Sequence, residues 1–392
     1  NFIMQFTLLG IPVNELLIIL LFCFNINHVI SSNNYKNIKH SIVLWFTISV
    51  ILIFTGLFTY GIVAGRDGTG QIDILLLLVL ISLPYKLISF AKFEKIILTI
   101  LIFKLIDRFI LGSLFGFTFG EFGLPIFGGT IGINIAITSA FILGLIKFDI
   151  NYKYKLLFFG ALLLIVSTQN RYMYIGITMI VFYLLYLRLI KFKKLLVYSI
   201  ILSVFLSFLS NLGSVGSGLS GFKYGGIPSP TSVVEHLMTS FGVESDNYSG
   251  SSDGFLIRSL WWADIINKSV DDSSIAFFGQ GFGIPLTNHN DYKIIREPHN
   301  SYLSVFARGG IFYFLIWLSI LSQILKKLHK SVRNIHSTQH QIITSLVAIS
   351  ILISTLIMAI VQPAFELPPV ATGTYFFIGI ALNYMKYENS YR

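Results

Sequence analysis

The sequence contains a single cysteine, Cys23, and this scarcity excludes two classes of protein. One thiol cannot form an intramolecular disulfide framework, and it cannot supply the paired thiolates of a structural zinc site. The chain also lacks the GxxxxGK[ST] phosphate loop, the HExxH helix of zinc peptidases and the GxSxG turn of hydrolases. We therefore expect neither a bound metal nor a cofactor.

Charged residues are also scarce. They make up only 12% of the 392 residues, whereas soluble domains carry about 25%. Hydrophobic residues account for 54%, and the mean hydropathy is +0.76. A chain this apolar cannot cover its surface with polar groups, so it needs lipid as part of its solvent. The net charge of +10 is distributed among short loops, which does not favour nucleic acid as a partner.

About eleven apolar segments approach the ~20 residues that a helix needs to cross the hydrocarbon core. We therefore predict an all-α polytopic membrane protein. The chain begins with Asn rather than Met, which leaves room for a twelfth helix in the full-length protein. The predicted segments are 4–24, 41–63, 72–91, 96–117, 127–147, 154–169, 173–190, 194–211, 300–325, 342–362 and 369–385.

The loops between these segments alternate in charge. Most of the 28 basic residues lie in every second loop and in the C-terminal tail. Cytoplasmic loops are enriched in Lys and Arg, so we predict that these loops face the cytoplasm. The chain then divides into transmembrane helices in 1–211, a large periplasmic or extracellular loop in 212–299, and further transmembrane helices with a cytoplasmic tail in 300–392.

The large loop opens with the Gly-, Ser- and Pro-rich run NLGSVGSGLSGFKYGGIPSP, which is typical of irregular structure. Its middle, GFLIRSLWWADIINKS (254–269), has apolar residues at roughly helical spacing. We expect a short amphipathic helix along the membrane interface, anchored by Trp261 and Trp262. We interpret GQGFG (279–283) as a turn and VDDSS (270–274) as a solvated loop rather than an ion site.

His299 stands between this loop and the apolar segment that follows it, in REPHNSYLSVFARGGIFYF (296–314). In an ideal helix, Gly310 would lie on the face of His299 and about 16 Å deeper. That glycine would permit close helix contact or leave room for a lipid chain. Arg308 would lie near the opposite face. On these residues alone, a histidine that only hydrogen-bonds to backbone is as consistent as a functional one.

The same stretch resembles a family signature. It has His-Asn, nine residues, Gly, two residues and then Tyr, at His299, Asn300, Gly310 and Tyr313. The pattern is similar to that of the O-antigen ligase and O-antigen polymerase superfamily, which are membrane-embedded glycosyltransferases with one large external loop before this helix. Shorter similarities cover STQNR (167–171), GFLIRSLWWADII (254–266) and FFGQGFG (277–283).

The resemblance implies that His299 is the catalytic base and that Arg171 and Arg258 bind the diphosphate of an undecaprenyl-diphosphate-linked glycan. Imidazole titrates near neutral pH, which suits a general base. Guanidinium groups are always charged and bind phosphate oxygens in pairs. On the residues alone, either arginine could instead contact lipid headgroups.

The implied reaction is metal-independent transfer of the glycan to an acceptor hydroxyl at the outer leaflet of the inner membrane, with inversion expected. A polymerase, which we favour slightly, would extend another lipid-linked glycan, with a chain-length regulator as a further partner. A ligase would use lipid A–core or a protein as acceptor. A flippase or transporter is the alternative from another class.

Further polar residues have open roles. Arg296, Asn300 and Gly310 are supporting candidates beside His299, and we expect Arg296 and Glu297 to form an ion pair that holds the loop. Lys104, Asp107 and Arg108 are charges inside a predicted span, where functional roles are common. Lys104 and Asp107 are also three residues apart and able to pair with each other.

Overall fold

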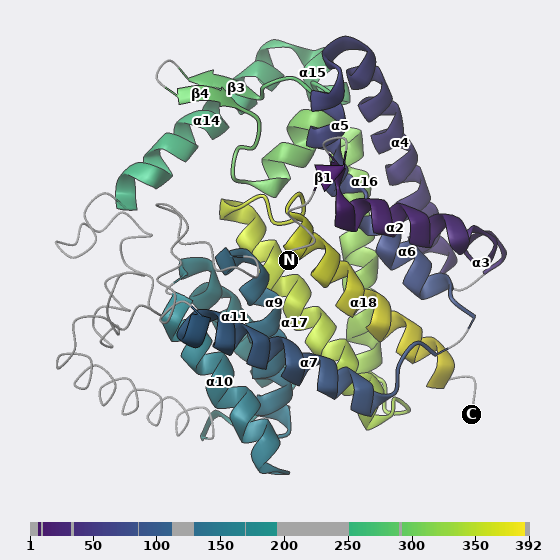
Figure 1. Cartoon of the computed structure of the whole chain (residues 1–392), viewed down its shortest axis with the longest axis vertical. Helices are drawn as coiled ribbons and strands as arrows, with labels where there is room; N and C mark the ends of the chain where they lie inside the picture. Colours follow the sequence, from purple (N-terminus) through teal and green to yellow (C-terminus); the bar gives the residue numbers. More distant parts are fainter. Residues whose placement is uncertain are drawn as a thin grey trace. The chain divides into compact units, whose positions relative to one another are not determined.

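The computed structural model describes residues 7–8, 11–32, 35–84, 86–111, 129–168, 170–193, 251–289 and 292–388. Within these ranges the regular structure is helical apart from two short antiparallel strand pairs (Figure 1). These pairs are β1 (Thr7–Leu8) with β2 (Ile11–Pro12), and β3 (Thr287–His289) with β4 (Tyr292–Ile295). The predicted helical fold class is confirmed at this level.

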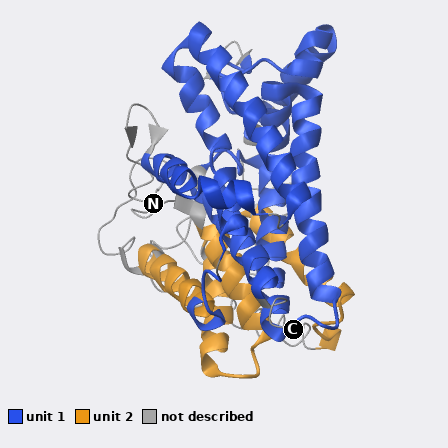
Figure 2. Cartoon of the chain, turned by 90° about the vertical axis from the view of Figure 1, so that its right-hand side faces the viewer, with its two compact units in different colours: residues 1–92, 257–392 blue, residues 93–256 orange. Residues whose placement is uncertain are grey.

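The chain forms two compact units (Figure 2). Residues 1–92 and 257–392 make the first, and residues 93–256 make the second. The first contains α2 (Val13–Phe24), α3 (Ile26–Ser31), α4 (Lys36–Tyr60), α5 (Ile62–Gly68), η1 (Thr69–Gln71), α6 (Ile74–Ser82), most of α14 (Ser251–Asp271), α15 (Ser273–Phe278), α16 (Ser301–Arg333), α17 (Gln339–Val361) and α18 (Pro368–Glu388). The second contains most of α7 (Phe90–Leu105), then η2 (Ile106–Leu111), α9 (Gly129–Ile146), α10 (Tyr152–Thr168) and α11 (Arg171–Tyr186).

Three of the described helices, α4, α16 and α17, are long and apolar enough to cross a membrane. Shorter apolar helices accompany them. These helices support the prediction of a membrane protein by their length and composition, whereas the number of crossings and their orientation stay predictions. The predicted span 194–211 lies wholly outside the described residues, as does the first part of the large loop, 212–250. The predicted division at 211 and 299 follows membrane topology rather than packing, and it also stays a prediction.

Two predicted spans are shorter as helices than expected, and proline accounts for one of them directly. α6 ends at Ser82 because Leu83 precedes Pro84 and is extended, with φ −53° and ψ 139°. Proline disfavours the helical conformation in the residue before it and has no N–H to continue a helix. In the segment predicted at 4–24, the β1–β2 pair comes first and α2 begins only after Pro12.

α6 is the most enclosed helix of the first unit, and every one of its residues is buried. A helix that is apolar on all sides belongs inside a protein or a bilayer. α18 packs closely against it, since a Cβ on Gly379 would lie 2.6 Å from a carbon of Leu80. Lys386 Nζ and Tyr387 OH both donate to the Leu83 carbonyl oxygen, at 2.9 and 2.8 Å, so this end of α6 keeps hydrogen-bond partners.

The second unit is built around the close packing of α9 and α10. A Cβ on Gly144 would lie 2.6 Å from the backbone nitrogen of Phe158, so only glycine fits there. Glu94 joins the same end, because it accepts hydrogen bonds from Lys147 at 2.8 Å and Lys153 at 3.0 Å. The predicted pair of Lys104 and Asp107 is confirmed at 3.8 Å.

α16 is not one continuous helix. Gly310 has φ 71° and ψ −173°, which interrupts the helix between Ser301 and Arg333. The ideal-helix placement of Gly310 relative to His299 does not hold for a separate reason: that calculation started at His299, which has φ +51°, and the helix begins only at Ser301. A Cβ on Gly310 would lie 2.2 Å from the carbonyl oxygen of Phe277 in α15, so the glycine permits a close backbone approach and leaves no room for a lipid chain.

Candidate functional site

His299 lies in the loop between β4 and α16, in an uncommon backbone conformation. Its φ is +51°, a left-handed value that costs a residue with a Cβ about 1–3 kcal/mol and persists only where neighbours hold it. The next residue, Asn300, is the N-cap of α16, and its side-chain oxygen accepts from the backbone N–H of Leu303 at 3.1 Å. The helix start therefore fixes the chain directly after His299.

The imidazole is half-buried and has two neighbours. Its Nδ1 lies 3.3 Å from Oε1 of Gln362, and its ring stacks on Trp261 with 6.3 Å between ring centroids. Burial lowers the pKa of His299 below its ordinary value of 6.5, and the positive charge of Arg258 lowers it further. The ring is therefore neutral at pH 7. Its polar partner is a side chain, so the alternative of a histidine bonded only to backbone is not what the structure shows.

α14 brings Arg258 to this loop. The predicted amphipathic segment is helical, and Arg258, Trp261 and Trp262 share one face at i, i+3 and i+4. Arg258 Nη1 donates to the carbonyl oxygen of Val361 at 3.3 Å, and Trp262 Nε1 donates to that of Pro298 at 2.8 Å. Trp262 therefore serves a protein contact, while its predicted role as a membrane anchor stays a prediction.

Glu366 and Gln362 lie in the connection between α17 and α18, and sequence reasoning did not single out either residue as functional. Ser301 Oγ donates to Glu366 Oε2 at 2.6 Å and accepts from the backbone N–H of Phe365 at 3.2 Å. Burial raises the pKa of Glu366 to about 7. The sequence feature that could have drawn attention to these two residues is QPAFELPP (362–369), a short run with prolines and two polar residues between two apolar segments.

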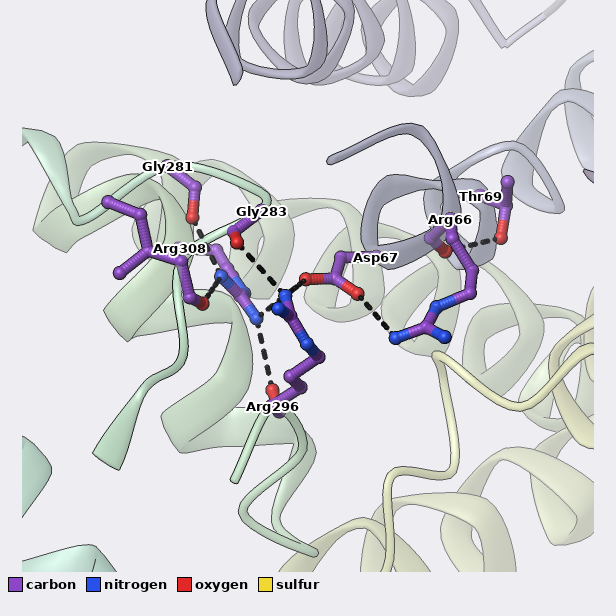
Figure 3. Close-up of polar contacts among 8 residues, drawn as sticks. Arg66, Asp67, Thr69, Gly281, Gly283, Arg296 and Arg308 are labelled. Carbon is purple, nitrogen blue, oxygen red and sulfur yellow. Dashed lines mark hydrogen bonds and ion pairs between the residues drawn. The ribbon is translucent and has the colours of Figure 1, made fainter. Parts of the chain in front are cut away.

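Asp67 gathers three arginines at the end of α5 (Figure 3). Its Oδ2 lies 2.9 Å from Arg296 Nη1 and 3.4 Å from Arg308 Nη2, and its Oδ1 lies 3.7 Å from Arg66 Nη2. The ion pair expected for Arg296 therefore exists, but its partner is Asp67 rather than the neighbouring Glu297. The pair ties the loop before His299 to the first part of the chain.

Arg308 was excluded from the site by ideal-helix geometry, and the structure instead joins it to the loop of His299. Its guanidinium donates to the carbonyl oxygens of Gly281, Ile284 and Arg296, at 2.9, 2.6 and 3.0 Å. Its side chain is only 4% exposed, so these acceptors and Asp67 replace water around a buried charge. The glycine-rich turn at 279–283 has the predicted irregular form, and this arginine holds it.

Arg171 belongs to the second unit. It is the first residue of α11, after Asn170 in an extended conformation, and its side chain lies outside the described part of the chain. Its predicted role in binding a diphosphate stays a prediction. The structure thus brings two of the three sequence-predicted site residues, His299 and Arg258, into one neighbourhood.

Within the described ranges, no group of three or more His, Cys, Asp or Glu side chains is arranged to hold a metal ion. No family model and no curated protein matches the chain.

The described site offers a neutral imidazole, an adjacent guanidinium and a stacked indole. Such a set can accept a proton from a hydroxyl while it stabilises an anion nearby.

Proposed function

We propose that this protein transfers a glycan from an undecaprenyl-diphosphate-linked donor to an acceptor hydroxyl at the outer leaflet of the inner membrane. The observation that carries the proposal is the meeting of His299 and Arg258. The two residues are distant in sequence, and α14 and the loop before α16 bring them together. The resemblance of the segment around His299 to O-antigen polymerases and ligases supports the same reaction.

The hydrogen bond to Gln362 defines the role of each imidazole nitrogen. With the amide oxygen of Gln362 as acceptor, Nδ1 carries the ring proton, and Nε2 keeps its lone pair. Nε2 takes the proton of the acceptor hydroxyl as that oxygen attacks the anomeric carbon. The bond from this carbon to the diphosphate oxygen breaks, and undecaprenyl diphosphate leaves with the electron pair. Arg258 offsets the growing negative charge.

The acceptor distinguishes the two enzymes of this class. We favour a polymerase, which joins one lipid-linked glycan to another, over a ligase, which transfers the glycan to lipid A–core or protein. Deletion of the gene distinguishes them: cells that lack a polymerase display single repeat units, whereas cells that lack a ligase accumulate long chains on the carrier lipid.

Transfer by the purified protein is the direct test of the proposed reaction. The protein in detergent is mixed with lipid-linked glycan and EDTA, and the products are separated by size. Longer glycan with release of undecaprenyl diphosphate supports a polymerase. No new glycosidic bond, with either glycan or lipid A–core as acceptor, would reject the proposal, and movement of the intact donor across proteoliposomes would favour a flippase.

A further inference from the structure

The break in α16 leaves backbone carbonyl groups that the helix itself does not use. In a continuous helix, the carbonyl oxygens of Ala307 and Arg308 would accept from residues four positions later, beyond Gly310. They accept instead from the backbone N–H groups of Gln280 at 2.7 Å and Gly281 at 2.9 Å. The turn after α15 therefore caps the break.

Besides these hydrogen bonds, the backbone at the end of α15 approaches the backbone at the break very closely. A Cβ on Gly279 would lie 2.4 Å from the carbonyl carbon of Arg308, and a Cβ on Gly310 would lie 2.2 Å from the Phe277 oxygen. Both glycines have positive φ. No side chain separates the two segments at these glycines, so the end of α15 lies at the same level of the molecule as the break.

The level of the break follows from helix geometry. Lys326 is the first of the basic residues near the end of α16. From Lys326 back to Gly310 the helix rises about 24 Å, at ~1.5 Å per residue. The hydrocarbon core of a bilayer is about 30 Å thick. With Lys326 taken to lie at one face of the core, the break is inside the core, several ångströms from the opposite face. Unsatisfied carbonyl groups at that depth are strongly unfavourable, which explains why a turn caps them.

The face of α15 that points away from the protein is apolar at this level. Phe278 is 70% exposed and Phe277 is 48% exposed. Phe277 stacks on Phe312 of α16 with 5.9 Å between ring centroids, and Phe312 is itself 56% exposed. Leu315, further along the same helix, is 52% exposed. The surface of α15 is thus continuous with the exposed apolar face of a helix long enough to cross the membrane.

The other end of α15 is polar. Asp271, Asp272, Ser273 and Ser274 are all exposed, and Asp272 caps the helix by accepting from the Ser274 backbone N–H at 2.8 Å. The helix is only about 9 Å long, at ~1.5 Å per residue. It therefore has a hydrated start and an apolar end. This polarity matches a segment that enters the bilayer surface and turns back at Gly279.

We propose that α15 and the turn at 279–283 form a re-entrant element, with Phe277 and Phe278 in contact with the acyl chains of the leaflet farther from the basic end of α16. Part of the predicted external loop then lies within the membrane, where it shields the broken backbone from lipid. This inference is independent of glycan transfer.

Site-directed spin labelling measures the depth directly. Cys23→Ser removes the single cysteine, and Phe278→Cys introduces a label at a largely exposed position where little packing is lost. The folded protein in lipid nanodiscs is probed for collision with oxygen, which concentrates in acyl chains, and with a water-soluble nickel chelate. Leu315→Cys is the lipid reference and Asp271→Cys the water reference. Ile335→Cys is a matched control, since Ile335 is equally apolar and 91% exposed but follows the basic end of α16.

We expect the label at 278 to collide with oxygen more often than with the nickel chelate, as at 315, and we expect the reverse at 271 and 335. Phe278→Trp, quenched by lipids with brominated acyl chains, should report the same contact without a label. Nickel accessibility at 278 equal to that at 271 would overturn the proposal. Shielding from both probes would also overturn it, because protein or a second copy of the chain would then cover the face.

Discussion

At the residue scale, the base and its electrostatic neighbour make a prediction about pH. The pKa of His299 is lowered by burial and then by the charge of Arg258. The neutral ring is the reactive form, so transfer should fall as pH drops through this lowered pKa, below 6.5. Arg258→Gln removes the charge and should move this acid limb to higher pH, whereas Arg258→Lys should move it much less. Rate profiles of the three proteins from pH 4.5 to 8 measure this. An unchanged acid limb in Arg258→Gln would disprove the coupling.

Glu366 makes a second prediction at this scale, in stability rather than rate. Burial raises its pKa from an ordinary 4.5 to about 7, so the folded chain holds a proton that the unfolded chain has lost. Its contribution to stability is therefore complete below pH 4.5 and declines as pH rises towards 7. Glu366→Gln should be less sensitive to pH over this window, measured as the thermal midpoint. Ser301→Ala should extend the decline to higher pH, because the Ser301 hydrogen bond lowers this pKa. A slope in Glu366→Gln equal to that of the native protein would contradict the assignment.

Sequence reasoning identified His299 and Arg258 because both stand in short segments that resemble a family pattern. Sequence reasoning did not identify Asp67, Gln362 or Glu366 as functional, and the reason is physical. Each is a common polar residue in a short connection, and its role depends on a partner far away in the sequence, such as Arg308 or Ser301. Nothing in the local pattern around such a residue indicates which distant side chain it will meet.

At the scale of the element, the break in α16 predicts opposite effects of one substitution at two glycines. Gly310→Ala must place a Cβ 2.2 Å from the Phe277 oxygen at φ +71°, and the left-handed backbone alone costs about 1–2 kcal/mol. Gly65→Ala in α5 meets only an ordinary 3.5 Å contact with Leu57, so it should be neutral or stabilise by about 0.5–1 kcal/mol. Thermal midpoints in one detergent compare them. Equal midpoints for the two variants would mean that α16 is not broken at Gly310.

The ion pairs of Asp67 predict a second contrast between elements. Asp67→Asn leaves the guanidinium of Arg308 buried without its counter-charge, and such a loss is worth about 3–5 kcal/mol. Asp264→Asn removes the partner of Lys268 at 3.1 Å, but both side chains are more than a third exposed, so the change should be about 0–1 kcal/mol. Unfolding in increasing denaturant measures both. If Asp67→Asn is no more destabilising than Asp264→Asn, the three arginines do not depend on this carboxylate.

Helix positions were predicted well where apolar runs were uninterrupted, as for α4 and α17, because burial in lipid or protein requires such runs. The internal form of α16 was not predictable in the same way. Two adjacent glycines permit a break but do not require one, and the decision comes from α15, whose turn supplies the replacement hydrogen bonds. Arg308 was misplaced for another reason: its direction was calculated for a helix that starts at His299, whereas His299 has φ +51° and α16 begins only at Ser301.

At the scale of the whole molecule, composition was sufficient for the class. A chain with 12% charged residues cannot be fully hydrated, and the described part contains three helices able to cross a bilayer. The larger number of predicted spans rests on hydropathy. A short apolar helix such as α6 contributes to that number although it is enclosed by other helices instead of lipid. Hydropathy responds to both environments in the same way.

The most direct test of the account is the rate of glycan transfer by His299→Ala beside His336→Ala, in the purified protein with lipid-linked donor. His336 is exposed in the connection between α16 and α17 and serves as the matched control. Loss of a general base lowers rates by about 10²–10⁴-fold. We expect that loss in His299→Ala, with thermal stability retained, and a native rate in His336→Ala. Equal rates in the two variants would show that the imidazole of His299 takes no part in the transfer.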